Sequence, residues 1–309
     1  MQIILMEEEH LETIIELDQM AFQREEPRSL QNLQGLREGD EEGCFVLMDG
    51  QELVGYSFSK TMGEEGYLGP LGIHPSLQGQ GRGKKLIQRS LDYLQRHCKV
   101  VGLEVRPEAG NNIGLYHKLG FNSAYPSLIL KVPEKLSGPE KKANLGDGVN
   151  QDDDNLRVEL FQPTLDNRKE TVLEKIDKWT RQELGGVSYL KDLNLASRCG
   201  GDILIALHKD EPVGFLTFYP SVFLHLWGGA VKPHPRQDQI LKEILRLFRE
   251  IHGPGEVLLE VNTCYHDLVD FILGEDFRIE KSVVRMLLED FEGEHLKKSQ
   301  NMVMRAWHA

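Results

Sequence analysis

Residues 68–75 and 78–87 decide the fold of this chain: they read LGPLGIHP and QGQGRGKKLI. The first stretch is apolar and stops at a proline, which is typical of the end of a strand. The second places Gly79, Gly81 and Gly83 directly before an amphipathic segment. Glycines let a loop backbone approach a bulky group, and the first turn of a helix presents unpaired N–H groups at its positive end. The pattern therefore predicts a strand, a loop and a helix that together bind a phosphate or pyrophosphate.

Two common phosphate-binding motifs do not fit this loop. A Walker loop needs a lysine followed by Ser or Thr, whereas Lys84 is followed by Lys85. The dinucleotide fingerprint G-x-G-x-x-G is one residue longer than the run from Gly79 to Gly83. A nucleotide held in either of these ways is excluded.

The loop does match the pattern Gln/Arg-x-x-Gly-x-Gly/Ala, which Gln78, Gly81 and Gly83 fill. A short apolar strand, 100–105, and a segment that reads NNIGLYHKLGF, 111–121, follow in that order. Together they resemble the acyl-CoA loop and the later helix of the GNAT superfamily of N-acyltransferases. The resemblance covers residues 1 to about 132 and implies that the donor is acetyl-CoA.

The periodicity of the first part of the chain agrees with that resemblance. Apolar spacing predicts one helix after Glu8 and a second one from Ser29. Asp49-Gly50 is a strong signal for a hairpin. The strands are expected at 2–5, 43–48, 53–58, 68–75 and 100–105. The order β-α-α-β-β-β-α-β-α-β is that of the superfamily, whose fold is α/β, with a twisted mixed and largely antiparallel sheet flanked by helices.

The length of the chain suggests two domains, because 309 residues are many for one compact core. We expect a catalytic domain at 1–132, a linker rich in turn and charged residues at 133–154, and a second domain at 155–292. A tail at 293–309 includes the apolar run MVMRAW, which can dock on its own chain or on a neighbour.

An internal repeat predicts that the second domain is a degenerate copy of the first. Residues 210–215 read DEPVGF and repeat the QELVGY of 51–56, and the apolar strand recurs at 227–233. Continuing this register pairs Gln78 with Arg236, Gly81 with Gln239 and Gly83 with Leu241. Later in the chain Phe277 corresponds roughly to Phe121, and Ile272 stands five residues before it, where Tyr116 stands five before Phe121. The copy would thus lack the loop glycines and the hydroxyl, so we expect two tandem GNAT-like domains of which one binds acetyl-CoA. The alternative is an unrelated α/β domain that matches by chance.

The composition of the chain limits the classes of partner that it can bind. A net charge of −13 disfavours nucleic acid, whose phosphates need a basic surface, and mildly favours a cationic amine. No apolar run approaches the roughly 18 residues of a membrane helix, so we expect a cytoplasmic protein without a membrane partner. The four cysteines form no C-x-x-C pair and the histidines show no ligand spacing, so we expect buried thiols and no metal.

The resemblance also assigns site residues. Backbone groups of Leu71, Gly72 and Ile73 would align the pantetheine arm and the thioester, and the run from the loop into the helix would hold the pyrophosphate: Gln78, Gly79, Gln80, Gly81, Arg82, Gly83 and Lys84. Asn112 is the candidate for a further pantetheine contact. The superfamily often has Asn seven residues before its Tyr, where this chain has Ala109, so the match is imperfect.

Tyr116 is the candidate general acid for the departing sulfur, since a phenol can protonate a thiolate in a dry cleft. The plain alternative is a core aromatic residue. Glu104, near the end of the fifth strand, is the first candidate for the general base, and Glu64 and Glu65 are the others.

The expected function is transfer of an acetyl group from acetyl-CoA to a primary amine, by direct transfer within a ternary complex. The alternative is a CoA-binding sensor or interaction protein without turnover. The acceptor, a small molecule or a peptide, stays open.

Overall fold

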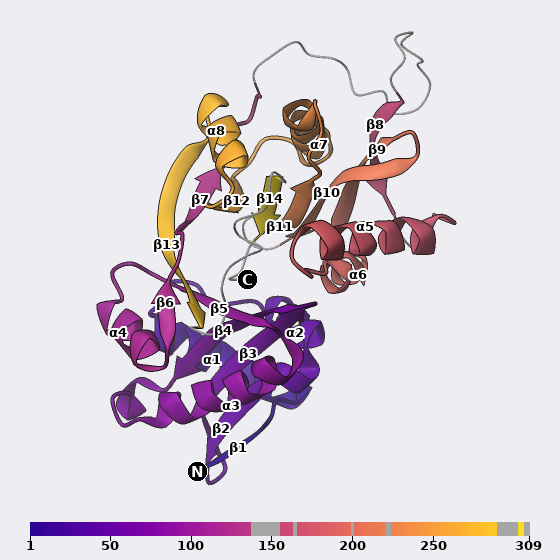
Figure 1. Ribbon diagram of the computed structural model, residues 1–309. Helices are drawn as coiled ribbons and strands as arrows, with labels where there is room; N and C mark the ends of the chain where they lie inside the picture. The colour runs from indigo at the N-terminus through magenta and orange to yellow at the C-terminus, as the bar shows by residue number, and fades with distance from the viewer. Residues whose placement is uncertain (137–154, 163–165, 199–200, 221–223, 289–301, 306–309) are drawn as a thin grey trace.

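The computed structural model describes residues 1–136, 155–162, 166–198, 201–220, 224–288 and 302–305, and it shows two similar halves (Figure 1). The elements of the first half follow the predicted order. They are β1 (Gln2–Leu5), α1 (Leu11–Phe22), α2 (Leu30–Gly39), β2 (Phe45–Asp49), β3 (Glu52–Met62), β4 (Glu65–Ile73), α3 (Arg82–His97), β5 (Val100–Val105), α4 (Gly110–Lys118), β6 (Phe121–Ser123) and β7 (Ser127–Lys131). The predicted mixed α/β fold is confirmed.

The second half repeats this order. Its elements are β8 (Leu156–Phe161), α5 (Lys169–Glu183), α6 (Leu190–Arg198), β9 (Asp202–His208), β10 (Glu211–Pro220), β11 (Leu224–Val231), α7 (Gln237–His252), β12 (Val257–Asn262), α8 (His266–Gly274) and β13 (Arg278–Leu288). A last strand, β14 (Met302–Arg305), follows in the C-terminal tail. The helices α3 and α7 have equal lengths, and so do α4 and α8, so the internal repeat in the sequence is also a repeat in the structure.

One continuous sheet joins the two halves through an exchange of strands. Its order is β1-β2-β3-β4-β5-β13-β7-β12-β11-β10-β9-β8. The last strand of the first half, β7, pairs with β12, while residues 284–287 of β13 pair with β5. In Figure 1, β13 runs from the second half down to the first. The expected boundary at 132 falls just after β7, so each half ends its sheet with a strand from the other.

Helix packing explains the buried faces of the first half. Along α3, Leu86, Ile87, Leu91 and Leu94 recur at helical spacing and are all buried. Each such side chain contributes about 1.5–3 kcal/mol when it leaves water. The opposite face of the sheet is covered by α1, whose buried residues pack with those of β3 in a separate cluster. The sheet therefore carries one helical layer on each side.

A second set of contacts joins the halves near the start of α6. Lys191 Nζ lies 3.1 Å from Asp40 Oδ2, and Lys60 pairs with the buried Asp192. The backbone of Glu64 donates to Gly186 O at 3.0 Å. These contacts hold α6 against the first half, beside a cavity of about 470 Å³.

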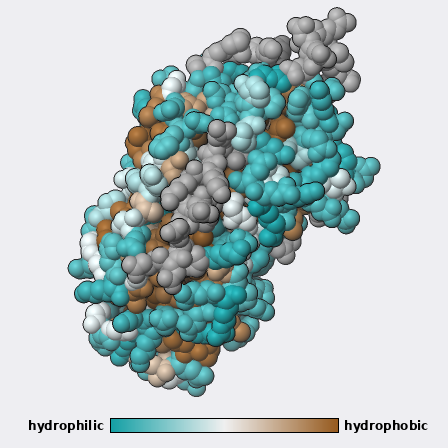
Figure 2. Space-filling model, in the orientation of Figure 1, coloured by the Kyte–Doolittle hydropathy of each residue, from teal (hydrophilic) through white to brown (hydrophobic). Residues whose placement is uncertain are grey.

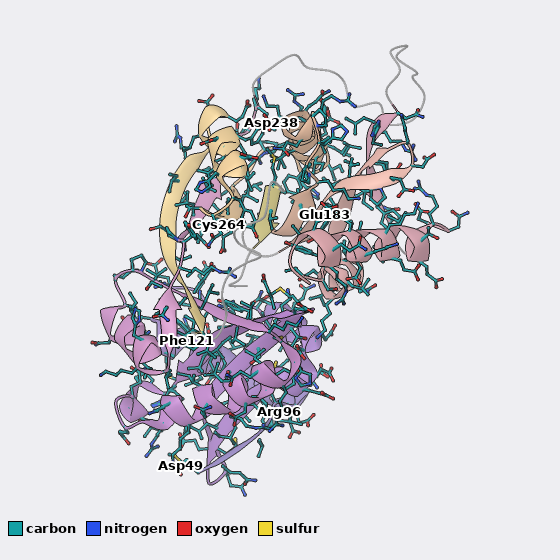
Figure 3. All side chains as sticks on the ribbon, in the orientation of Figure 1. Asp49, Arg96, Phe121, Glu183, Asp238 and Cys264 are labelled. Carbon is teal, nitrogen blue, oxygen red and sulfur yellow. The ribbon has the colours of Figure 1, made fainter. Side chains whose placement is uncertain are left out.

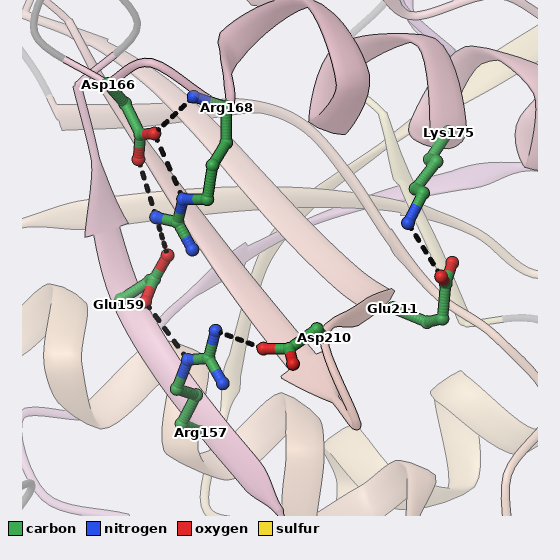
Figure 4. A network of polar contacts seen from close by, with 7 residues as sticks. All are labelled: Arg157, Glu159, Asp166, Arg168, Lys175, Asp210 and Glu211. Carbon is green, nitrogen blue, oxygen red and sulfur yellow. Dashed lines mark hydrogen bonds and ion pairs between the residues drawn. The ribbon is translucent and has the colours of Figure 1, made fainter.

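The outer edge of the second half is charged. In Figure 4, Arg157 of the edge strand β8 contacts Asp210 at 2.7 Å, and Arg168 contacts Glu159 at 2.6 Å. The guanidinium of Arg168 lowers the pKa of Asp166. Charged side chains on an edge strand discourage pairing with another sheet, so this network protects the end of the long sheet.

The surface is mostly hydrophilic on the face shown in Figure 2, with several separate hydrophobic groups. Within the described part of the chain, no helix is long and apolar enough to cross a membrane. Cys44, Cys98 and Cys264 are buried thiols that form no disulfide, and Figure 3 marks Cys264 in the second half. Cys199 lies outside the described residues.

Candidate active site

Strands β4 and β5 pair along only part of their length. The parallel register covers Glu65–Tyr67 against Val100–Gly102 and then stops. The ladder between β3 and β4 shifts between Ser57 and Ser59, where β4 carries an extra residue. Such a bulge bends a strand, and here it turns β4 away from β5. Beyond Tyr67, the edge of β4 that faces β5 pairs with no strand that the structure describes.

The predicted loop lies at the end of this free edge. Gly79 and Gly81 have φ of +73° and +74°, a region that L side chains rarely adopt, and a Cβ at either position would meet no atom within 4 Å. Gly83 is in the first turn of α3, where a Cβ would lie 3.4 Å from Ile73 Cγ1. Gln78 Nε2 donates to Ile73 O at 3.0 Å and ties the loop to the strand. The loop backbone is thus open to a ligand at the N-terminus of α3.

The other residues that the sequence predicts to contact acetyl-CoA belong to β4, to this loop, to α3 and to α4. Leu71 and Ile73 flank Gly72, against which the ring of Tyr56 packs closely enough to exclude a Cβ. Gln80 donates to Ser76 O at 3.1 Å. The two cationic side chains differ in their partners: Arg82 Nη1 lies 3.6 Å from Asp49 Oδ2, while Lys84 is exposed. Asn112 is exposed in the first turn of α4.

Tyr116 lies on α4 in the cluster that α3, β5 and β6 form. Its ring meets Phe121 edge-on with centroids 5.8 Å apart. Burial raises the pKa of Tyr116 to about 12, so the phenol keeps its proton at neutral pH. Its hydroxyl makes no hydrogen bond within the described part of the chain. The ring packs as a core aromatic would, and the hydroxyl remains available as a donor.

Glu104 is half-buried on β5, next to the point where the two strands part. Ser127 Oγ donates to Glu104 Oε1 at 2.5 Å. The two other candidate bases differ in burial: Glu64 is partly exposed and its carboxylate lies 2.6 Å from Lys99 Nζ, while Glu65 is buried at the start of β4.

The structure adds residues that the sequence reasoning missed. Tyr67 is buried, and its pKa is raised well above the ordinary value by burial first and then by the charges of Glu104 and Glu260. Glu260 of β12 and Arg285 of β13 are also buried. One signal was present: residues 103–105 and 259–261 both read LEV, so Glu260 is the repeat counterpart of Glu104.

The corresponding cleft of the second half is filled by the chain itself. β11 and β12 pair in parallel over three residues and then part, as β4 and β5 do. Strand β14 pairs with Gly228–Val231 of β11 and also contacts β12. Met302, Val303 and Met304 are buried there. The apolar tail therefore docks on its own chain, at the position that corresponds to the unpaired edge of β4 in the first half.

The loop of the second half also differs from the expected register. α7 begins at Gln237, which corresponds to Arg82 at the start of α3, so the loop 232–236 is three residues shorter than 74–81. The counterpart of Gly81 is thus Arg236 rather than Gln239, and its φ is −123°. The predicted register missed this shortening because it extends the repeat through the loop without allowing a gap. Ile272 does occupy the position of Tyr116.

The described residues include no group of three or more His, Cys, Asp or Glu side chains that could hold a metal. A cavity of about 430 Å³ lies at the loop of the second half and is lined by Pro233, His234, Pro235, Gln237, Asp238 and Asp267. It contains two carboxylates and no lysine or arginine, which does not suit a pyrophosphate.

Comparisons with known proteins agree with this geometry. Residues 11–121 match the model of the acetyltransferase (GNAT) family. The chain is 31% identical over 81 residues to the [ribosomal protein bS18]-alanine N-acetyltransferase of Escherichia coli. That match covers 26% of this chain and 55% of the relative, so the chain spans about half the length of this curated relative.

Two solved structures share the fold over both halves. A putative acetyltransferase from Pyrococcus horikoshii has a TM-score of 0.68 at 16% identity, covering 99% of this chain and 94% of that one. A tandem GNAT protein from the clavulanic acid biosynthesis pathway has a TM-score of 0.62 at 13% identity, covering 94% and 99%. Residues 11–121 therefore match the acetyltransferase (GNAT) family, and the whole chain shares its fold with a solved tandem GNAT protein.

Proposed function

We propose that this chain is an N-acetyltransferase that uses acetyl-CoA as the acyl donor and binds it between β4 and β5 of the first half. The observation that carries the proposal is the pair of parting strands followed by a loop with two left-handed glycines at the N-terminus of α3. Backbone N–H groups there bind the pyrophosphate. The free edge at Leu71–Ile73 pairs with the pantetheine amides.

The chemistry is direct transfer within a ternary complex. The neutral amine nitrogen of the acceptor attacks the thioester carbonyl carbon, the new C–N bond forms and the C–S bond breaks. Glu104, directly or through water, takes the proton that the amine loses, and the Tyr116 hydroxyl gives a proton to the departing sulfur. A pKa near 12 keeps Tyr116 protonated until that step.

The second half binds no acetyl-CoA in this proposal. Side chains of β14 occupy its cleft, its loop is shorter, and Ile272 replaces the tyrosine. We propose one donor site per chain, with residues 1–132 as the catalytic domain, 133–154 as the linker and 155–292 as the degenerate domain. Most of that linker lies outside the described residues.

The acceptor is a primary amine on a small molecule or a peptide. The E. coli relative is named for acetylation of an alanine of a ribosomal protein, and that sequence likeness covers only 26% of this chain. We therefore do not assign the alanine acceptor of that relative to this chain.

The test measures binding and turnover separately. Isothermal titration with acetyl-CoA should give one site per chain, and a thiol-release assay against an amine panel should give turnover. Tyr116→Phe should keep donor binding and reduce kcat by about 10²- to 10⁴-fold, as expected for loss of a general acid. Tyr125→Phe is the control because Tyr125 is 50% exposed.

Two results would count against this reading. Donor binding without thiol release for any amine would favour a CoA-binding sensor instead. Unchanged kcat in Tyr116→Phe would reduce Tyr116 to a core aromatic residue.

A further inference from the structure

A row of buried polar side chains crosses the junction of the two halves. In the ladders, Tyr67 lies opposite Gly102, and Arg285 lies opposite Glu104. Ser127 lies opposite Asn262 on one side and Val283 on the other. Residues opposite each other, or two apart on one strand, share a face of the sheet. The row therefore includes residues of β4, β5, β13, β7 and β12 on one face.

A chain of hydrogen bonds runs along this row toward Glu104. Asn262 Nδ2 donates to Ser127 Oγ at 3.2 Å and to Tyr125 O at 2.7 Å. Ser127 Oγ in turn donates to Glu104 Oε1 at 2.5 Å. Ser127 is fully buried and Asn262 is 7% exposed. The orientation of one Glu104 oxygen is thus set by a residue of the second half.

Arg285 stands directly opposite Glu104 on the neighbouring strand β13. Directly opposite residues on antiparallel strands have Cβ atoms about 4.5–5.5 Å apart. The guanidinium lies beside Gly102, two residues before Glu104: a Cβ at Gly102 would lie 3.9 Å from a terminal nitrogen of Arg285. A buried arginine beside a carboxylate favours its ionised form.

We infer that the second half completes the catalytic centre of the first: Arg285 and Asn262, the latter through Ser127, hold Glu104 ionised and oriented toward the acceptor amine. They are positioning residues, and this role rests on the proposed function, with Glu104 as the base. The strand exchange brings them there, because β13 and β7 lie between β5 and β12.

Other titratable groups share this face of the sheet with Glu104. Glu260 of β12 is one, and the Tyr67 phenol of β4 is another; the charges of both carboxylates add to burial in raising the pKa of Tyr67. The pKa of Tyr67 is also raised by Tyr116 of α4 and lowered by Arg28, ahead of α2. A second carboxylate on this face disfavours the ionised form of Glu104, and Arg285 is a cation in the same row that offsets it.

The experiment compares pH–rate profiles of full-length variants. In Arg285→Met the acid limb of kcat should move to higher pH by about one unit, because a carboxylate without its cation is harder to ionise. Arg285→Lys should restore most of that shift. Ser127→Ala should move the acid limb in the same direction by a smaller amount. Asn262→Ala should also move the acid limb to higher pH.

Controls separate this role from a structural one. Arg249→Met removes another partly buried arginine of the second half, which donates to the backbone oxygens of Val132, Pro133 and Gly255. It should leave the acid limb in place. The melting temperature and donor affinity are measured for every variant.

The failure of each idea is distinguishable. If the wild type neither binds acetyl-CoA nor releases thiol, the proposed function fails. If the wild type turns over and the acid limb of both Arg285→Met and Ser127→Ala stays at the wild-type pH, this inference is overturned. Should Arg285→Met not fold, Ser127→Ala decides alone, since it removes one oxygen atom.

Discussion

Replacing Gly81 by valine tests the donor loop most directly. Gly81 precedes α3 with φ of +74°, and a Cβ there would meet no atom within 4 Å. The substitution therefore causes no clash with the described residues, and its cost is one of backbone conformation. For an L residue, that cost is about 1–2 kcal/mol.

The expected effect on binding follows from this cost. In the free protein the loop can relax to a negative φ, whereas binding requires the left-handed form that directs N–H groups to the pyrophosphate. The strain of about 1–2 kcal/mol is then taken from the binding free energy, which raises Kd about 5- to 30-fold. Isothermal titration with CoA measures the change.

Three variants serve as comparisons. Gly81→Asn should lose less affinity, because asparagine tolerates the left-handed region better than valine. Gly83→Ala should bind nearly as the wild type, since Gly83 is helical. Gly253→Ala places a side chain at another positive φ with open space, next to α7 in the second half. If Gly81→Val binds CoA like the wild type, or Gly253→Ala weakens binding equally, the assignment of this loop is wrong.

Three further outcomes are expected. Met304→Ala should lower the free energy of unfolding by about 2–5 kcal/mol in urea denaturation, because Met304 is fully buried in the core of the second half; a loss below about 1 kcal/mol would contradict the docking of β14. Activity should not fall between about pH 8 and pH 10 through loss of the Tyr116 proton, since burial raises that pKa to about 12; a fall absent from Tyr116→Phe would contradict this. Burial lowers the pKa of His252 below its ordinary value, so its neutral form is favoured by folding and stability is lost as pH falls through about 6.5. The melting temperature of His252→Gln should therefore drop less than that of the wild type between pH 7.5 and 5.5, and an equal drop would refute the assignment.

Local signals predicted the first half well. Leu11, Ile14 and Leu17 recur at helical spacing and are the buried face of α1. Ser29 caps α2 by accepting from Asn32 N. Strand 100–105 was predicted with the bounds that β5 has. These features depend on neighbours in the chain, which is why one sequence suffices to find them.

The centre of the molecule depends on long-range pairing and was not predictable in this way. Nothing local in residues 278–288 shows that their last residues pair with β5 rather than with the second half. The sequence accordingly assigned no role to Arg285 or Glu260. The apolar run at 302–305 was noticed, but its place beside β11 follows from a cleft that only the fold reveals.

The exchange of strands also has a consequence for biosynthesis. When residues 1–132 have left the ribosome, β5 still lacks the neighbour that residues 284–287 will supply. An unpaired edge is a template for association with other nascent chains. The first half must wait with this edge open until β13 has been translated, and a chain interrupted before β13 would leave the edge exposed to aggregation.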